Sequence, residues 1–315
     1  MKHLFIINPA AGNGKGYKFV PMIKELAKEH RAEKDCEIEL TQYPGHATEI
    51  ARKYAAIPGW RVYAVGGDGT VNEVLNGMIN SNNQMAVIPA GSGNDFVRSI
   101  GEKESAKKYF MNVIMGSPQI VDAGIVNGRY FLNVASLGID AEACRRAQKY
   151  KKHPILGGRT AYLVGAAIAL KNYATNDIEI AIDGETINEK ITLMIIANAK
   201  YYGGGIPAAP NADMADGLLD VAIMPARTLY ELAKIAPYFY MGKQNRIDRL
   251  IQRQTKKVIV NSENLLTAEF DGEVCVDRKF TFEIASNAIN LVFPRSQHHQ
   301  QPILMAQDVE GNTDL

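Results

Sequence analysis

The sequence predicts an α/β N-terminal domain with a three-layer parallel sheet, followed by a β-rich C-terminal sandwich domain. In the first third of the chain, short apolar strands alternate with helical patterns, an order typical of a parallel sheet covered by helices on both faces. After about Gly116 strand patterns follow one another closely, and Asn127-Gly128 between two of them is a strong hairpin signal. A chain of 315 residues is also long enough for two domains of ordinary size.

We place the boundary at residue 120. The α/β domain covers residues 1–119, the sandwich covers 120–294, and residues 295–315 form a polar tail that could pack back on the first domain. In the first domain, strands are expected at residues 4–7, 37–41, 61–65 and 85–88, and helices begin at about Phe19, His46 and Val71. Pro58-Gly59 must end the second of these helices.

The second domain is expected to be largely antiparallel. Its strands are predicted at residues 121–126, 129–135, 178–182, 191–197, 218–224, 257–260, 266–270, 279–284 and 289–293, and its helices at 160–173 and 228–240. Asp183-Gly184 directly after the third strand predicts another hairpin turn.

Composition excludes several classes of function. Lys and Arg total 35 against 34 for Asp and Glu, so the chain has no strong global field for holding nucleic acid. The longest apolar stretch, residues 161–170, falls well short of the roughly 20 residues that a membrane-spanning helix needs. Three widely separated cysteines suggest neither a disulfide framework nor a zinc site. The N-terminal apolar run is too short for a signal peptide, so we expect a cytoplasmic protein.

Three expected strands of the first domain end in glycine-rich loops. Ligands of open α/β sheets bind beyond the carboxyl ends of the strands, so the three loops should line one crevice. The loop at residues 8–16 matches neither a dinucleotide fingerprint nor a P-loop and is weak evidence alone. The loop at residues 66–70 is more specific, because its glycines allow close approach of a phosphate, Asp68 offers a carboxylate to Mg²⁺, and Thr70 can cap the next helix.

These loops and two later segments together resemble a known family. Asn8-Pro9, Gly66-Gly67-Asp68-Gly69-Thr70, Gly91-Ser92-Gly93-Asn94-Asp95, the segment Asn-Ala-Asp-Met-Ala-Asp-Gly at residues 211–217, and Asp271-Gly272-Glu273 occur in this order across nearly the whole chain. The pattern resembles the diacylglycerol kinase catalytic family, in its bacterial soluble lipid kinase branch. The GGDGT loop alone is shared with NAD kinases and has relatives in phosphofructokinases, whereas the last two segments narrow the resemblance.

The resemblance implies an ATP site and a structural metal site. The residues that would contact ATP are Asn8, Pro9, Ala10, Ala11, Gly12, Thr41, Gly66, Gly67, Asp68, Gly69, Thr70, Val71, Asn72 and Ser92. Family members often carry Thr in place of Ser92, and the hydroxyl is retained. Asp213, Asp216 and Leu218 match positions that bind Mg²⁺ in the family, Asp216 through its carboxylate and the others through backbone carbonyls, and oxygen-only ligands suit this cation.

Glu273 has two readings. Asp271-Gly272-Glu273 lies between two strand patterns, where a surface hairpin turn is the simpler interpretation. The resemblance instead favours a catalytic site over a surface turn. It implies that Glu273 is the general base that orients and deprotonates the attacking hydroxyl, with Asp68 as the second catalytic residue. Phosphoryl transfer needs aligned phosphates, Mg²⁺ and such a base, with little covalent help from the protein.

The resemblance therefore implies an ATP-dependent lipid kinase, with diacylglycerol to phosphatidic acid as the leading reaction. The alternatives are a kinase of another lipid alcohol, an NAD kinase, or a non-catalytic lipid- or nucleotide-binding regulator. Retention of Asp68, Glu273 and all three glycine loops argues against the last.

The expected partners are ATP and a lipid acceptor at the inner face of a membrane, met peripherally and reversibly, with a homodimer left open. The densest basic cluster, Arg145, Arg146, Lys149, Lys151 and Lys152, is either a solvated helix face or a contact with lipid headgroups.

Overall fold

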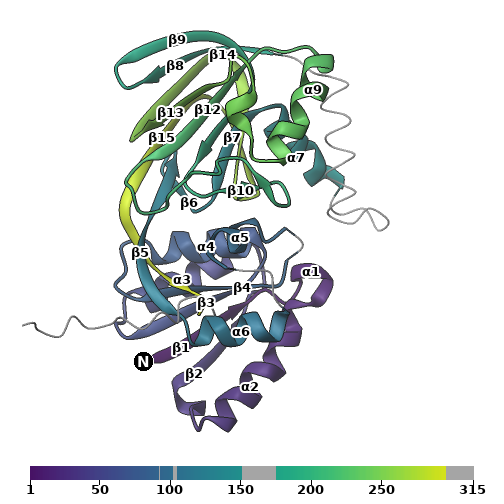
Figure 1. Cartoon of the computed structure of the whole chain (residues 1–315). Coiled ribbons are helices and arrows are strands. Elements are labelled where there is room, and N and C mark those ends of the chain that lie inside the picture. Colours follow the sequence, from purple (N-terminus) through teal and green to yellow (C-terminus); the bar gives the residue numbers. More distant parts are fainter. Residues whose placement is uncertain (92, 102–104, 151–174, 296–315) are drawn as a thin grey trace, which may run out of the picture.

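The computed structural model describes residues 1–91, 93–101, 105–150 and 175–295. Residues from the first third of the chain form the α/β part, at the bottom of Figure 1, and the β-rich part lies above it. Among the residues described, no helix has the length and apolar character needed to cross a membrane.

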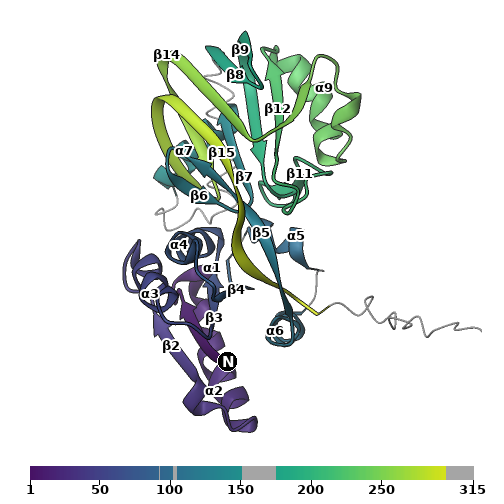
Figure 2. The same ribbon diagram turned by 90° about the vertical axis from the view of Figure 1, so that its left-hand side faces the viewer.

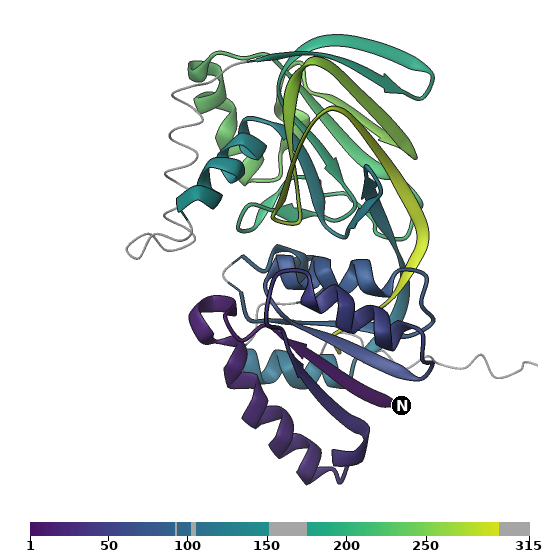
Figure 3. The same cartoon turned by 180° about the vertical axis from the view of Figure 1, so that it is seen from behind.

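The N-terminal sheet is parallel and has the strand order β2-β1-β3-β4. Its elements in chain order are β1 (Lys2–Ile7), α1 (Ala11–Gly14), α2 (Phe19–Glu29), β2 (Cys36–Leu40), α3 (His46–Ala55), β3 (Trp60–Gly66), α4 (Asp68–Met78), β4 (Gln84–Pro89), α5 (Asp95–Ile100) and α6 (Ala106–Ile114). The alternation of side chains along a strand explains the layers, since Leu4 and Ile6 pack with α3 and α4 while Phe5 and Ile7 pack with α2 and α6. Figure 3 shows the helices on the two faces.

The C-terminal part is antiparallel. Its elements are β5 (Ser117–Val126), β6 (Arg129–Phe131), β7 (Val134–Gly138), α7 (Ile139–Tyr150), β8 (Asn176–Ile182), β9 (Glu185–Ala197), β10 (Tyr201–Tyr202), β11 (Ile206–Pro207), β12 (Leu219–Pro225), α9 (Leu229–Tyr240), β13 (Ile251–Thr255), β14 (Lys257–Phe270) and β15 (Glu273–Phe293). The sheet path runs β13-β12-β9-β7-β14-β15, and β8 pairs with β9 and β14. Phe131, Phe270, Phe280 and Phe282 are fully buried in its core.

Two long strands, β5 and β15, connect the two parts. They pair antiparallel with each other and descend together from the β-rich part to the α/β part (Figure 2). At its far end β15 pairs in parallel with β4, through Asn290 opposite Gln84 and Leu291 opposite Met85. The last strand described in the chain therefore completes the N-terminal sheet, and the boundary predicted at residue 120 falls inside β5.

Several element predictions need correction. The expected strands 257–260 and 266–270 are one strand, β14, and 279–284 and 289–293 are one strand, β15, because a register shift in each was read as a loop. The expected strand 129–135 is split at Leu132-Asn133, whose N–H groups bind the Asp271 carboxylate instead of a neighbouring strand. The structure also contains α6, α7 and β13, which the sequence analysis did not predict.

Other predictions agree or lie outside the described residues. Both hairpin turns are present, with positive φ at Asn127-Gly128 and at Asp183-Gly184. Helix α4 begins at Asp68, three residues before the expected start at Val71, so the glycine loop itself forms the first turn. The expected helix 160–173 and the tail after Arg295 lie outside the described residues.

Gly124 on β5 provides a test of the packing beside the connecting strands. The ring of the fully buried Phe131 lies over Gly124, and a Cβ built there would be 2.1 Å from Cζ of that ring. Gly124→Ala should lower stability by about 1–3 kcal/mol because the ring must shift within a close-packed core. In a Phe131→Leu background the same substitution should cost clearly less, measured as the difference in Tm. Equal losses in both backgrounds would contradict the contact.

Candidate functional site

A cavity of about 570 Å³ lies between the two parts of the molecule. Three segments that the sequence analysis singled out line it, namely the loop of Gly67, Asp68 and Gly69, the loop of Gly93 and Asp95, and the turn of Asp271, Gly272 and Glu273. Residues of α7 and the loop after β10 complete its wall. The structure therefore brings the predicted catalytic residues Asp68 and Glu273 to one cavity.

The three glycine loops lie side by side, as the sequence predicted for a parallel sheet. Asn8 Nδ2 donates to Thr70 Oγ1 at 3.2 Å, and the backbone N–H groups of Ala90 and Gly91 both donate to the Gly66 carbonyl. A Cβ on Gly91 would lie 2.5 Å from Cα of Gly67, so only glycine allows the second and third loops to touch. Ala10 donates its N–H to Asn8 Oδ1, which shapes the first loop.

Not every predicted ATP residue faces this cavity. Gly12 lies against the third loop, because a Cβ there would meet the Ala90 carbonyl oxygen, and Thr41 continues β2 by donating its N–H to the Ile7 carbonyl. The buried Asn72 points instead to the β-rich part and donates to the Tyr130 carbonyl at 2.9 Å. Ser92 lies outside the described residues.

Asp68 lies partly buried at the start of α4. Its Oδ2 accepts a hydrogen bond from the Asn94 N–H at 3.2 Å. Burial, with smaller contributions from the carboxylates of Asp95 and Asp271, raises the pKa of Asp68 to about 6. Asp95 faces the same space; its Oδ2 accepts from the Gly204 N–H at 2.8 Å, and burial raises its pKa as well. Asp95 belongs to the third loop motif but was not among the predicted site residues.

Asp271 holds the turn between β14 and β15. Its carboxylate accepts from the N–H groups of Leu132 and Asn133 at 2.8 and 3.0 Å and from Nδ2 of Asn72 at 3.2 Å. Positive φ values at Asp271 and Gly272 give a tight two-residue turn that places Glu273 opposite Phe270 in the ladder. Asp271 is thus tied to both parts of the molecule.

Glu273 projects from this turn toward the second glycine loop. A Cβ on Gly69 would lie 3.9 Å from Oε1 of Glu273. The Glu273 side chain is 42% exposed, and its Oε2 lies 3.9 Å from Nη2 of Arg129. This carboxylate is therefore accessible from the cavity and close to the N-terminus of α4, where a phosphate group is favoured.

Two further buried acids, Glu269 and Asp140, were missed by the sequence analysis. Glu269 Oε1 accepts from the Gly272 N–H at 2.6 Å, so Glu269 supports the turn that carries Glu273. Burial, followed by the charges of Asp140, Asp271 and Asp68, raises the pKa of Glu269 to about 8, and burial raises that of Asp140 to about 6. The available signal was an acid inside the apolar pattern of residues 266–270.

The cavity is strongly acidic. Among the described residues, its lining includes the carboxylates of Asp68, Asp95, Asp140, Glu269, Asp271 and Glu273 and a single cationic side chain, Arg98. Oδ1 of Asp140 is buried and, within the described part of the chain, has no hydrogen-bond partner. Such a wall suits divalent cations, which take oxygen ligands.

The predicted metal residues form a separate turn outside this cavity. Oδ1 of Asp213 accepts from the Ala215 N–H, and Oδ1 of Asp216 accepts from the Leu218 N–H. The turn is fastened by the buried Asp122, which accepts from the Gly217 N–H at 2.8 Å. Neither there nor elsewhere in the described residues are three or more His, Cys, Asp or Glu side chains placed so that together they could hold a metal ion. An exposed carboxylate with neighbouring backbone carbonyls nevertheless offers the oxygen donors that Mg²⁺ takes.

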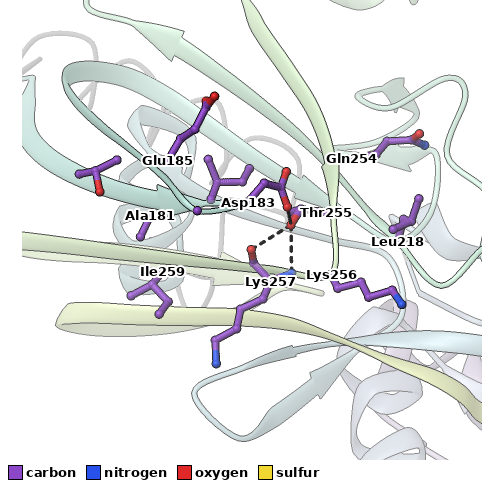
Figure 4. Close-up of a pocket in the computed structure, with 12 residues that line it drawn as sticks. Ala181, Asp183, Glu185, Leu218, Gln254, Thr255, Lys256, Lys257 and Ile259 are labelled. Atoms are coloured by element: carbon purple, nitrogen blue, oxygen red, sulfur yellow. Dashed lines mark hydrogen bonds between the residues drawn. The ribbon is translucent and has the colours of Figure 1, made fainter.

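A second hollow, of about 590 Å³, lies far along the β-rich part (Figure 4). It is lined by residues of the turns at Asp183-Gly184 and Thr255-Lys256, and Thr255 donates to Asp183 Oδ1 at 2.7 Å. Of the predicted site residues only Leu218 reaches it. The inter-domain cavity is therefore the candidate site.

The sequence as a whole matches known proteins. A diacylglycerol kinase of Bacillus subtilis (strain 168) is 30% identical over 298 residues, covering 94% of this chain and 97% of its own length. The chain belongs to the diacylglycerol kinase catalytic-domain family. The family model "Diacylglycerol kinase catalytic domain" matches residues 2–126, and "YegS C-terminal NAD kinase beta sandwich-like domain" matches residues 133–293.

Other members of the diacylglycerol kinase family are similar over the whole length. A diacylglycerol kinase of Staphylococcus carnosus (strain TM300) is 28% identical and covers 98% of this chain and 96% of its own. A solved structure of a diacylglycerol kinase from Bacillus anthracis (strain Sterne) has a TM-score of 0.68 at 22% identity, covering 93% of this chain and 96% of that chain, and therefore shows the shared fold. The predicted family and fold class are confirmed, and the protein is a lipid kinase of this family.

The raised pKa of Glu269 gives a prediction for stability. The folded protein binds the proton of the Glu269 carboxyl more tightly than the unfolded chain does. Protonation of Glu269 therefore stabilises the fold fully below about pH 4.5, and this stabilisation is lost as the pH rises through about 8. Glu269→Gln keeps the shape of the side chain but does not titrate. Over this pH range, the Tm of the parent should therefore fall relative to the Tm of Glu269→Gln. Glu263→Gln, at an exposed position of β14, is the control and should follow the parent profile. Parallel profiles of parent and Glu269→Gln would contradict the burial effect.

Proposed function

We propose that the protein transfers the γ-phosphate of ATP to the hydroxyl of diacylglycerol, giving phosphatidic acid and ADP. The observation that carries the proposal is the position of the accessible Glu273 carboxylate across from the glycine loop of Asp68 and Gly69 in one acidic cavity. The names of the similar diacylglycerol kinases support the choice of acceptor.

In the proposal the nucleotide lies on the three adjoining glycine loops. Small residues and backbone N–H groups there suit phosphate oxygens, and the N-terminus of α4 adds its positive dipole end. An excess of carboxylates would repel a bare triphosphate, so ATP should enter with Mg²⁺ held by Asp68 and Asp95. The cation would supply charge neutralisation on the phosphates.

Glu273 acts on the acceptor. The acceptor oxygen attacks the γ-phosphorus, the bond from that phosphorus to the β–γ bridging oxygen breaks, and ADP leaves. The hydroxyl proton passes to Glu273, which we propose as the general base. Arg129 lies at 3.9 Å and limits the positions of this carboxylate. Asp271 and Glu269 hold the turn beneath it.

We further propose that the turn of Asp213, Asp216 and Leu218 holds a structural Mg²⁺ and that the protein works peripherally at the inner face of the membrane. The metal would stabilise the segment that Asp122 fastens to β5. A kinase of a different lipid alcohol uses the same arrangement and is the alternative, which a lipid extract incubated with labelled ATP and analysed by mass would identify. A parallel incubation with NAD in place of the lipid extract would test NAD as the acceptor.

Glu273→Gln should lose activity while keeping ATP binding, because the amide preserves shape but removes the base. We expect kcat to fall on the order of 10²-fold or more, with an unchanged Tm and a similar dissociation constant for Mg·ATP. Glu263→Gln is the control and should keep parental kcat. A kcat of Glu273→Gln within about threefold of the parent would rule out this role.

Asp68→Asn should impair Mg·ATP use. Its apparent Mg²⁺ requirement should rise by about tenfold or more, since the amide loses the charge that attracts the cation. The measurement is initial rate against Mg²⁺ concentration at fixed ATP. If the Mg²⁺ requirement of Asp68→Asn is unchanged, Asp68 has no role in binding Mg·ATP and serves only at the start of α4.

Asp216→Ala should abolish a Mg²⁺-dependent rise in Tm of the nucleotide-free protein. A ligand that binds only the folded state raises stability, so the parent should melt higher with Mg²⁺. Asp277→Ala removes another exposed aspartate, one that accepts from the backbone N–H of Arg278 within β15, and should keep the response. If Mg²⁺ does not change the Tm of the parent, the turn holds no Mg²⁺.

A further inference from the structure

Helix α9 exposes an unusually apolar surface. Its inner face packs Leu232, Ile235 and Phe239 against the outer core of the β-rich part, but no α9 residue is fully buried. On the outside, Tyr230 and Tyr240 are each 69% exposed, and Leu229 and Met241 are about half exposed. These four side chains lie at the two ends of one surface helix, and large apolar side chains gathered on an exposed surface indicate an interaction site.

The charge around this helix is positive. From residue 228 to residue 250 the exposed cations are Lys234, Lys243, Arg246 and Arg249. Of the two acids in this stretch, Glu231 closes the capping box with Thr228 and lies 3.9 Å from Nη1 of Arg227, so its charge is already engaged. Asp248 is therefore the one acid in this stretch whose charge can offset the four cations.

We propose that this α9 surface, formed by Leu229, Tyr230, Tyr240 and Met241 with Lys234, Lys243, Arg246 and Arg249, docks the kinase reversibly on an anionic lipid bilayer. Tyrosine rings with polar tips suit the level of the headgroups, and the surrounding cations match an anionic surface. The inference deepens the proposed function, since it rests on a lipid acceptor and assigns the surface that meets it.

The basic cluster considered in the sequence is less suited to this role. Arg145 and Arg146 both lie against the Glu142 carboxylate, at 2.6 and 2.7 Å, so one of their two positive charges is balanced and both side chains are held within α7. Lys151 and Lys152 lie outside the described residues.

The apolar core that supports α9 extends to the candidate site. Tyr202 packs in the same apolar cluster as the inner face of α9, and it lines the inter-domain cavity. Tyr202 therefore connects the wall of the cavity with the core beneath the proposed bilayer contact.

The test is co-sedimentation of the full chain with phosphatidylcholine vesicles, with and without phosphatidylglycerol, at low and high salt. We expect binding that requires phosphatidylglycerol and weakens with salt. Tyr230→Gln/Tyr240→Gln should weaken it by about tenfold, because burial of two aromatic rings at the interface is lost. Lys243→Gln/Arg246→Gln/Arg249→Gln should reduce its salt sensitivity.

The matched control is Ile57→Gln/Leu265→Gln, which removes two exposed apolar side chains elsewhere and should bind as the parent does. All variants should keep the parental Tm. Parental binding by the tyrosine variant, or no vesicle binding by the parent, would overturn the proposal. So would conversion of a dimer to a monomer by the tyrosine variant with unchanged vesicle binding, since the surface would then join two copies.

Activity separates docking from catalysis. The tyrosine variant should phosphorylate diacylglycerol in vesicles several-fold more slowly but a short-chain, monomerically dissolved diacylglycerol at the parental rate. Equal loss with both substrates would overturn the docking role. The vesicle-binding arms contain neither ATP nor diacylglycerol, so they decide the docking question even if the parent phosphorylates no diacylglycerol and the proposed function fails.

Discussion

The buried carboxylate of Asp271 is the interaction on which the candidate site depends. It accepts hydrogen bonds from Leu132 and Asn133 of the β-rich part and from Asn72 of α4, so this side chain links the two parts at the candidate site. The turn it occupies carries Glu273 on one side and is braced by Glu269 on the other. Charge-assisted hydrogen bonds of this kind are shorter and stronger than neutral ones, which suits a group that must set the geometry of a reaction.

Placing several carboxyl groups around one cavity has an electrostatic cost. Burial raises the pKa values of Asp68, Asp140 and Glu269, and repulsion by neighbouring carboxylates adds to the rise at Asp68 and Glu269, so each of these groups holds a proton more readily than it would in water. A group of strained acids around an open cavity is typical of a functional site, because a cation relieves the repulsion when it binds. In the proposed function, Mg²⁺ entering with the nucleotide would relieve this repulsion.

The sequence predicted the N-terminal sheet well, because strands such as Phe5–Ile7 are short, apolar and bounded by glycine loops whose chemistry is visible residue by residue. The loop motifs also led to the correct family. Prediction failed where partners distant in the chain decide the outcome. A bulge near Asn261 looks like the end of a strand until β15 is beside it, and Glu269 looks like a surface acid until Asp140, Gly272 and Ser136 surround it. Register and burial of polar groups depend on tertiary neighbours that a single sequence does not display.

The route of β15 has a consequence for synthesis on the ribosome. Its end pairs with β4, so the N-terminal sheet keeps an open edge at β4 until residues 290–291 have emerged. An exposed parallel edge invites pairing with other chains, and contacts between segments some 200 residues apart in sequence slow folding. The edge of the first-made part of this kinase therefore stays open until nearly the last part described here is made, and during that time the β4 edge is the place where pairing with other chains is to be expected.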